Sequence, residues 1–146
     1  MKKLFYFITF QVMLLMAFSA VAQNDVKIRK EFDSGLILIS VNPALNNGNE
    51  FDKSSMPYQE DVVGISTGNK NPIKISDLVL KDGIAYVKVC TENGSIKKGD
   101  LITSSSEQGV GMKATESGIV LGIALEDAQT ASGLVKVRLM IQYVKQ

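Results

Sequence analysis

The sequence contains no histidine, and this absence removes most of the catalytic chemistry that proteins carry out near neutral pH. A Ser-His-Asp triad, a Cys-His pair and a histidine-bearing zinc site all require an imidazole. The single cysteine, Cys90, excludes an internal disulfide and a cysteine-rich metal cluster. We therefore expect no catalytic residue, no cofactor and no metal ion, and a fold held by its core and its hydrogen bonds.

Two further classes of function are disfavoured by composition. Tryptophan is absent and only four tyrosines occur, so the sequence offers little aromatic surface for stacking against sugars. Two of the 16 basic residues lie in the first 22 positions and none of the 15 acidic residues does, so 14 basic residues face 15 acidic ones in the remainder, a net charge of −1. Nucleic-acid binders carry a basic footprint, and we expect no nucleic-acid partner.

Hydrophobic residues are concentrated at the N-terminus. Lys2 and Lys3 precede an apolar run from Leu4 to Ala20, which ends in Ala20-Val21-Ala22-Gln23. This pattern predicts a signal peptide over residues 1–22, cleaved after Ala22, and a secreted, periplasmic or cell-surface protein with no membrane span after cleavage. An uncleaved membrane anchor is the alternative, because about 18 apolar residues can span a bilayer. A lipoprotein anchor is excluded, because it would require a cysteine at the cleavage point, where this sequence has Gln23.

The mature chain reads as a lead-in over residues 23–34 followed by one all-β domain over residues 35–146. Helix signals are scarce, and short β-branched runs are separated by Gly, Asn, Ser and Asp, which predicts many short strands. The loop from Asn42 to Pro57 is rich in turn residues, and Asn93-Gly94 predicts a type I′ turn with a hairpin-like reversal. The predicted strands are Val26–Arg29, Leu36–Val41, Asp61–Ser66, Ile73–Ile75, Ile84–Cys90, Leu101–Thr103, Gly111–Lys113, Ile119–Ala124 and Leu134–Tyr143.

The last predicted strand alternates at first and then becomes wholly apolar. We therefore expect it to be a central strand with one wet face in its N-terminal half and with both faces covered in its C-terminal half.

An internal repeat is the most informative feature. Residues 35–66 and residues 99–126 share the pattern Gly-x-apolar-apolar-x-Ser, with Ile-Leu in the first and Leu-Ile in the second, then a lysine, then apolar-apolar-Gly-Ile. Such self-similarity indicates duplicated structural units. We predict two related β-modules that pack together as a small sandwich or barrel.

Several polar residues have two interpretations. The Thr103–Ser106 tract reads as a polar hairpin tip whose hydroxyls bond to their own backbone, while the alternative is a nucleophile activated by a nearby lysine or carboxylate. Glu126-Asp127 and Glu60-Asp61 read as solvated turn residues rather than acid–base pairs. Cys90 reads as a small buried side chain, with a free reactive thiol as the alternative.

The segment from Glu92 to Glu126 resembles a known family. Its order Glu-Asn-Gly-x-Ile-x-x-Gly-Asp-Leu-Ile-Thr-Ser-Ser, then Gly-Met-Lys-Ala, then Gly-Ile-Ala-Leu-Glu is similar to a β-domain that recurs in phage tail-fibre and neck-appendage proteins and in bacterial surface proteins. A fainter similarity is to capsid decoration proteins. The resemblance implies a structural cap, often trimeric, and some appendage relatives are linked to self-cleavage.

Together these patterns predict an exported, non-enzymatic structural or interaction domain with a protein partner or a self-association, a homotrimer included. An uncovered strand edge is a common site of such association. We expect the C-terminal residues Ile141, Tyr143 and Val144 to lie at that edge or seam. The alternative function is a self-processing protease that uses a hydroxyl of the 103–106 tract.

Overall fold

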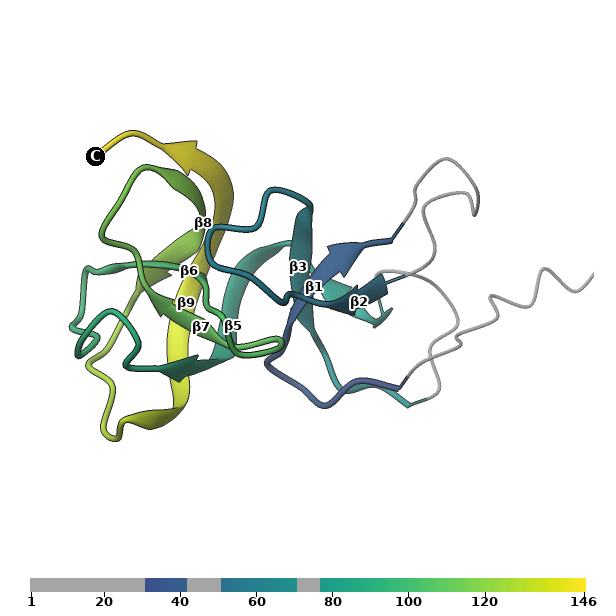
Figure 1. Cartoon of the computed structure of the whole chain (residues 1–146). Coiled ribbons are helices and arrows are strands. Elements are labelled where there is room, and N and C mark those ends of the chain that lie inside the picture. The colour runs from purple at the N-terminus through teal and green to yellow at the C-terminus, as the bar shows by residue number, and fades with distance from the viewer. Residues whose placement is uncertain (1–30, 42–50, 71–76) are drawn as a thin grey trace, which may run out of the picture.

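The computed structural model describes residues 31–41, 51–70 and 77–146 and is all-β in these ranges (Figure 1). The strands are β1 Ile37–Ser40, β2 Phe51–Lys53, β3 Val62–Ser66, β4 Val79–Leu80, β5 Asp82–Cys90, β6 Leu101–Ser104, β7 Gly111–Lys113, β8 Gly118–Ala124 and β9 Ser132–Val144. The all-β prediction is confirmed. The signal peptide, the predicted strand Val26–Arg29 and the predicted strand Ile73–Ile75 lie outside the described residues.

The strands form two layers. The first is a four-stranded sheet in the order β2-β1-β3-β4, and the second is a closed barrel in the order β5-β7-β6-β8-β9. All pairings are antiparallel except for the short contact of β5 with β7, at Val89 and Gly111. Figure 1 shows the first sheet lying against one side of the barrel.

The two layers contain the repeat predicted from the sequence. In each module a central strand, β1 or β6, pairs with a following strand on one side and with a third strand on the other, and the third strand then pairs with a fourth, β4 or β9. The registers also agree: Leu38 lies opposite Lys53 and Gly64, and Ile102 lies opposite Lys113 and Gly122.

The backbone hydrogen bonds of the modules are equivalent as well. Three pairs of bonds occupy matching positions of the repeat at 2.8–3.0 Å: Gly35 N to Ser66 O with Gly99 N to Ala124 O, Ser66 N to Leu36 O with Ala124 N to Asp100 O, and Ser54 N to Ile37 O with Ala114 N to Leu101 O. The chain is therefore built from two related β-modules, and the second is completed into a barrel by β5.

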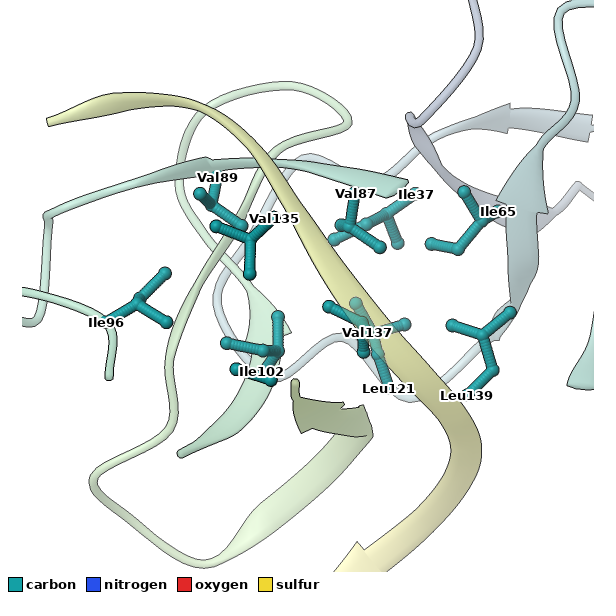
Figure 2. Packing of buried hydrophobic residues seen from close by; sticks show 11 residues of the cluster. Ile37, Ile65, Val87, Val89, Ile96, Ile102, Leu121, Val135, Val137 and Leu139 are labelled. Carbon is teal, nitrogen blue, oxygen red and sulfur yellow. The ribbon is translucent and has the colours of Figure 1, made fainter. Parts of the chain in front are cut away.

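A single core joins the layers. Ile37 and Ile65 of the first sheet are buried in the same cluster as Val87, Val137 and Leu139 of the barrel. Figure 2 shows these side chains meeting between the two layers. A second cluster fills the other side of the first sheet and contains Phe32, Leu36, Leu38, Phe51, Leu78 and Val79.

Backbone bonds add to this junction. Lys88 N donates to Gly35 O, and Ile37 N donates to Gly109 O, both at 2.8 Å. Gly35 has a φ of +82°, and a Cβ there would lie 2.9 Å from Tyr86 O. Glycine thus permits both the turn and the close approach to β5.

Three local predictions were wrong. The loop predicted from Asn42 to Pro57 contains β2, and β4 was not predicted at all. At Asn93-Gly94 the described positive-φ positions include Gly94 but not Asn93, so the turn is not type I′. Thr91 O accepts from Gly94 N, and the strands on either side, β5 and β6, are not paired with each other.

The prediction for the last strand was half right. β9 pairs with β5 on one side and β8 on the other, as expected for a central strand. Val135, Val137 and Leu139 point inward and are buried. The C-terminal half is not covered on both faces, because Tyr143 is 66% exposed. The apolar residues at this end of β9 therefore lie partly on the surface of the barrel and not between two layers.

Candidate interaction surface

The outer face of the β5–β9 ladder combines apolar and basic side chains. Val87 and Val89 of β5 and Val135 and Val137 of β9 face the barrel interior, so the residues between them point outward. Three neighbouring pairs of outward residues lie directly opposite each other: Ile84 with Arg138, Tyr86 with Lys136, and Lys88 with Leu134. We call these six residues the β5–β9 face.

The apolar members of this face are unusually exposed. Ile84 is 55% exposed, Tyr86 52% and Leu134 53%. Isolated exposed apolar side chains are ordinary, but a group of large ones on one rigid surface marks an interaction site. Here each apolar side chain has a cation as its cross-strand partner.

Positive charge dominates the β5–β9 face. The Lys136 ammonium lies 5.5 Å from the centre of the Tyr86 ring, a distance at which the ring attracts the cation. Among the described residues Lys88 has a carboxylate neighbour in Asp33, at 3.9 Å with an 84% exposed side chain, and exposed pairs of this kind contribute little. Asp82 lies one rung beyond Ile84. The three rungs themselves carry three cations and no carboxylate.

A groove borders this face where the two layers meet. It has a volume of about 350 Å³, and its apolar walls come from Leu80, Tyr86 and Leu134, with Ser34 and Thr67 at its polar side. A second groove, of about 480 Å³, is lined by small and uncharged residues between Thr91 and Ala131. The first groove is the better anchor site, because large apolar walls contribute most of the binding free energy of a buried side chain.

The repeat indicates that the basic residues of β9 are not required by the fold. Thr67 N donates to Leu78 O in the first module, as Leu125 N donates to Lys136 O in the second. A Cβ on Gly64 would strike Leu80 O, as one on Gly122 would strike Arg138 O. Lys136 and Arg138 thus occupy the positions of Leu78 and Leu80, so the backbone pairing that the modules share does not itself require a basic residue there.

The C-terminal residues predicted to form an edge lie beside this face. Tyr143 and Val144 pair with Ile119 and Gly118 of β8. The ladder with β5 ends where Met140 meets Asp82, so among the described residues Ile141 to Val144 have a strand neighbour on one side only. Ile141 and Val144 are half-buried and Tyr143 is exposed.

The Thr103–Ser106 tract is only partly a hairpin tip, because Ser105 and Ser106 begin the connection between the antiparallel strands β6 and β7. Thr103 and Ser104 belong to β6, and together with Ser105 they are buried. Thr103 donates its hydroxyl to Ile119 O at 2.6 Å, Ser104 to Met56 O at 2.9 Å and Ser105 to Val110 O at 2.8 Å. The Thr103 and Ser104 hydroxyls therefore join segments that are distant in sequence, which local sequence patterns do not reveal, whereas the Ser105 hydroxyl bonds to nearby backbone, as predicted.

Ser106 and the neighbouring lysines have other partners. The Ser106 hydroxyl donates to the Glu92 carboxylate at 2.9 Å. Lys113 pairs with Asp100 at 3.1 Å and Lys97 with Asp127 at 3.5 Å. The described contacts thus give each tract hydroxyl a partner other than a lysine.

Glu126-Asp127 is more than a solvated turn. Glu126 accepts a hydrogen bond from Lys136 N, and Asp127 accepts one from Lys98 N at 2.8 Å. The hydrogen bond from Lys98 N, with the charges of Lys97 and Lys98, lowers the pKa of Asp127 below its usual 3.8. The Asp127 carboxylate thus stabilises the turn that precedes β6. Glu60 and Asp61 are exposed, as predicted.

Cys90 lies on the outer face of β5 and is half-buried rather than buried. It continues the outward series of Tyr86 and Lys88, opposite Ser132. In the part of the chain that the structure describes, no three His, Cys, Asp or Glu side chains group as metal ligands would, and no helix has the length and apolarity needed to cross a membrane.

Comparisons with known proteins identify no relative: no protein-family model, no curated protein and no solved structure matches the chain. The resemblance to phage tail-fibre domains therefore remains a prediction from the sequence.

Proposed function

We propose that the mature chain is an exported, non-enzymatic interaction domain that binds another protein through the β5–β9 face, at the cell envelope or outside the cell. The observation that carries this proposal is the set of three exposed apolar side chains, each opposite a cation, on the outer face of the ladder. The N-terminal sequence pattern supports export.

The rigidity of the β5–β9 face favours a docking role. β5 and β9 pair continuously from Asp82–Met140 to Cys90–Ser132, so the six side chains project from a fixed frame. A rigid surface loses little conformational entropy on binding. Aromatic residues and arginine are enriched at protein interfaces, and the face contains Tyr86 and Arg138.

Site-specific photo-cross-linking in the producing cell tests this role. A benzoylphenylalanine placed at Leu134 is expected to form a discrete adduct with one other protein, and the same residue at the exposed Ser117 serves as the control. Equal adducts from both positions, or none from position 134, would contradict docking through the β5–β9 face.

Self-association is the second part of the proposal and concerns Ile141, Tyr143 and Val144. The exposed Tyr143 and the one-sided pairing of β9 beyond Met140 support it, since such an edge can accept a strand, and the family resemblance favours a homotrimer. Size-exclusion chromatography with light scattering measures the absolute mass of the mature chain. A trimer that Tyr143→Asp dissociates would support this seam, and a monomer would remove it.

Mass spectrometry distinguishes the proposal from the alternative of a self-processing protease. We expect the mature chain to keep its intact mass through long incubation. A fragment ending within residues 103–106 would instead favour self-cleavage. The same spectrum tests cleavage of the signal peptide after Ala22, since the mature chain would begin at Gln23.

A further inference from the structure

The charge of the β5–β9 face indicates the chemistry of what binds it. Arg138 and Lys136 stand two residues apart on β9, and Lys88 stands on β5 one rung further along. Successive rungs are separated by about 6.8 Å, so the cations form a diagonal row across the ladder. Ile84, Tyr86 and Leu134 fill the other half of each rung.

We propose that this face binds an acidic segment of a partner protein, lying extended along the ladder. The inference rests on the proposed function and adds the class of partner. Carboxylates of the segment pair with Arg138, Lys136 and Lys88, and one of its apolar side chains enters the groove between Leu80, Tyr86 and Leu134. Alternate residues of an extended chain face the same way, which matches the alternation of rungs.

Three carboxylates of the described chain lie near the face. Glu126 accepts a hydrogen bond from the backbone N of Lys136 at 3.0 Å, and the described contacts include no ion pair between its carboxylate and the Lys136 ammonium. Asp33 contacts Lys88 at 3.9 Å from an 84% exposed side chain, and Asp82 lies one rung beyond the last cation. Lys136 rests over the Tyr86 ring, which holds the ammonium near the surface and leaves it free to meet a carboxylate.

A second copy of this chain is a poor occupant for the face. A two-fold contact places the same patch on both sides, so two faces that each carry three cations and no carboxylate would be brought together. Like charges brought together at an interface weaken association. Complementary charge therefore favours a different chain, with at least two carboxylates close to an apolar residue.

The test uses a fluorescein-labelled peptide of sequence Glu-Ser-Leu-Ser-Glu-Ser-Glu and the mature chain, with binding followed by anisotropy. We expect saturable binding that weakens at high salt and that is lost when every Glu of the peptide is Gln. The double variant Lys136→Glu with Arg138→Glu is expected to weaken binding about tenfold or more. Leu134→Ser is expected to weaken it about tenfold.

A matched control makes the same change in net charge at two lysines that lie outside the β5–β9 face. Lys70→Glu with Lys145→Glu alters two exposed lysines outside the face and is expected to change the affinity less than about twofold. Circular dichroism on each variant checks that the barrel remains folded.

Three results would overturn the inference. These are equal binding of the Glu and Gln peptides, equal loss in the control and face variants, and binding of vesicles containing anionic phospholipid without binding of the peptide. If cross-linking from position 134 captures a partner while the peptide fails, docking through the face stands and its acidic chemistry is wrong.

Discussion

Two glycines at equivalent places in the repeat show how a single missing side chain permits strand pairing. A Cβ on Gly64 would lie 2.2 Å from Leu80 O, and one on Gly122 would lie 2.0 Å from Arg138 O. Both distances are shorter than a carbon and an oxygen can approach, and in each case the obstacle is backbone. The third strand of each module can therefore reach the fourth only if this position is glycine.

The expected result of Gly122→Ala is a loss of about 3 kcal/mol or more in the free energy of unfolding, because β8 and β9 must separate to admit the methyl group. Urea titration followed by circular dichroism measures it. Gly133→Ala is the control, since its Cβ would meet only the Thr130 hydroxyl at 2.9 Å, and we expect less than about 1 kcal/mol there. Equal effects would mean that the close approach is unimportant.

Asp127 predicts a pH dependence of stability. Its pKa is lowered in the folded chain, first by the hydrogen bond from Lys98 N, so its ionised form favours folding. That contribution is complete above the unfolded value near 3.8 and is lost as pH falls through the lower folded value. In Asp127→Asn, the deficit in Tm relative to the natural chain is expected to be constant above about pH 5 and to shrink below about pH 4.

Thermal unfolding of both chains between about pH 7 and about pH 2 measures this difference. Asparagine keeps the shape and one acceptor oxygen, so the comparison isolates the charge. Glu116→Gln removes an exposed carboxylate elsewhere and is the control. A deficit that grows on acidification would reverse the sign and reject the role of Asp127.

At the scale of elements, the segment between β2 and β3 is held against the barrel by polar side chains. Ser104 Oγ donates to Met56 O and accepts from Gln59 N, each at 2.9 Å. The Tyr58 hydroxyl accepts from Thr115 N at 2.8 Å and from Glu116 N at 3.0 Å. Ser104 of the Thr103–Ser106 tract therefore helps to hold the two layers together.

Removing the Ser104 hydroxyl tests this junction. Ser104→Ala is expected to lower the free energy of unfolding by about 1–3 kcal/mol, because Gln59 N would lose its partner in a buried site. Ser106→Ala is the matched control, since its partner Glu92 is exposed to water. Chemical denaturation of both variants gives the comparison, and a larger loss in Ser106→Ala would contradict this account.

Sequence patterns located most elements because their signals are local. β7, Gly111–Lys113, has the predicted bounds, and β1, β3, β6 and β8 lie within about a residue of theirs. β4 is a two-residue strand, Val79–Leu80, too short to show alternation. β2 begins at Phe51, next to an Asn-rich stretch that has the composition of a turn.

The β5–β9 face was harder to predict than the strands. Ile84, Tyr86 and Leu134 are residues typical of a core, and alternation alone does not say which face of a strand meets water. That depends on closure of the barrel, in which Val87 and Val135 point inward. The predicted edge at Ile141, Tyr143 and Val144 was found from position in the chain, and its role is still a prediction.

At the scale of the whole molecule, the first sheet and the barrel should unfold together. Ile65 is 1% exposed and belongs to the same cluster as Val87 and Leu139 of the barrel. Ile65→Ala is expected to lower the free energy of unfolding by about 2–5 kcal/mol. The transition should remain single, and coincident urea curves from circular dichroism and tyrosine fluorescence would show this.

Met56→Ala is the control for this prediction, because Met56 is 54% exposed and its removal should cost little. Two separate transitions in the Ile65→Ala chain would mean that the layers are independent folding units.

The equivalence of β4 and β9 carries a consequence for the history of the chain. If one ancestral unit was copied, each copy inherited the same outward positions, and the copies then diverged in what those positions do. In one copy Leu78 packs into the second core cluster, and in the other Lys136 lies on the outer face of the barrel. Duplication would in this way have supplied both a scaffold and a surface strand whose outward residues could change without loss of the fold.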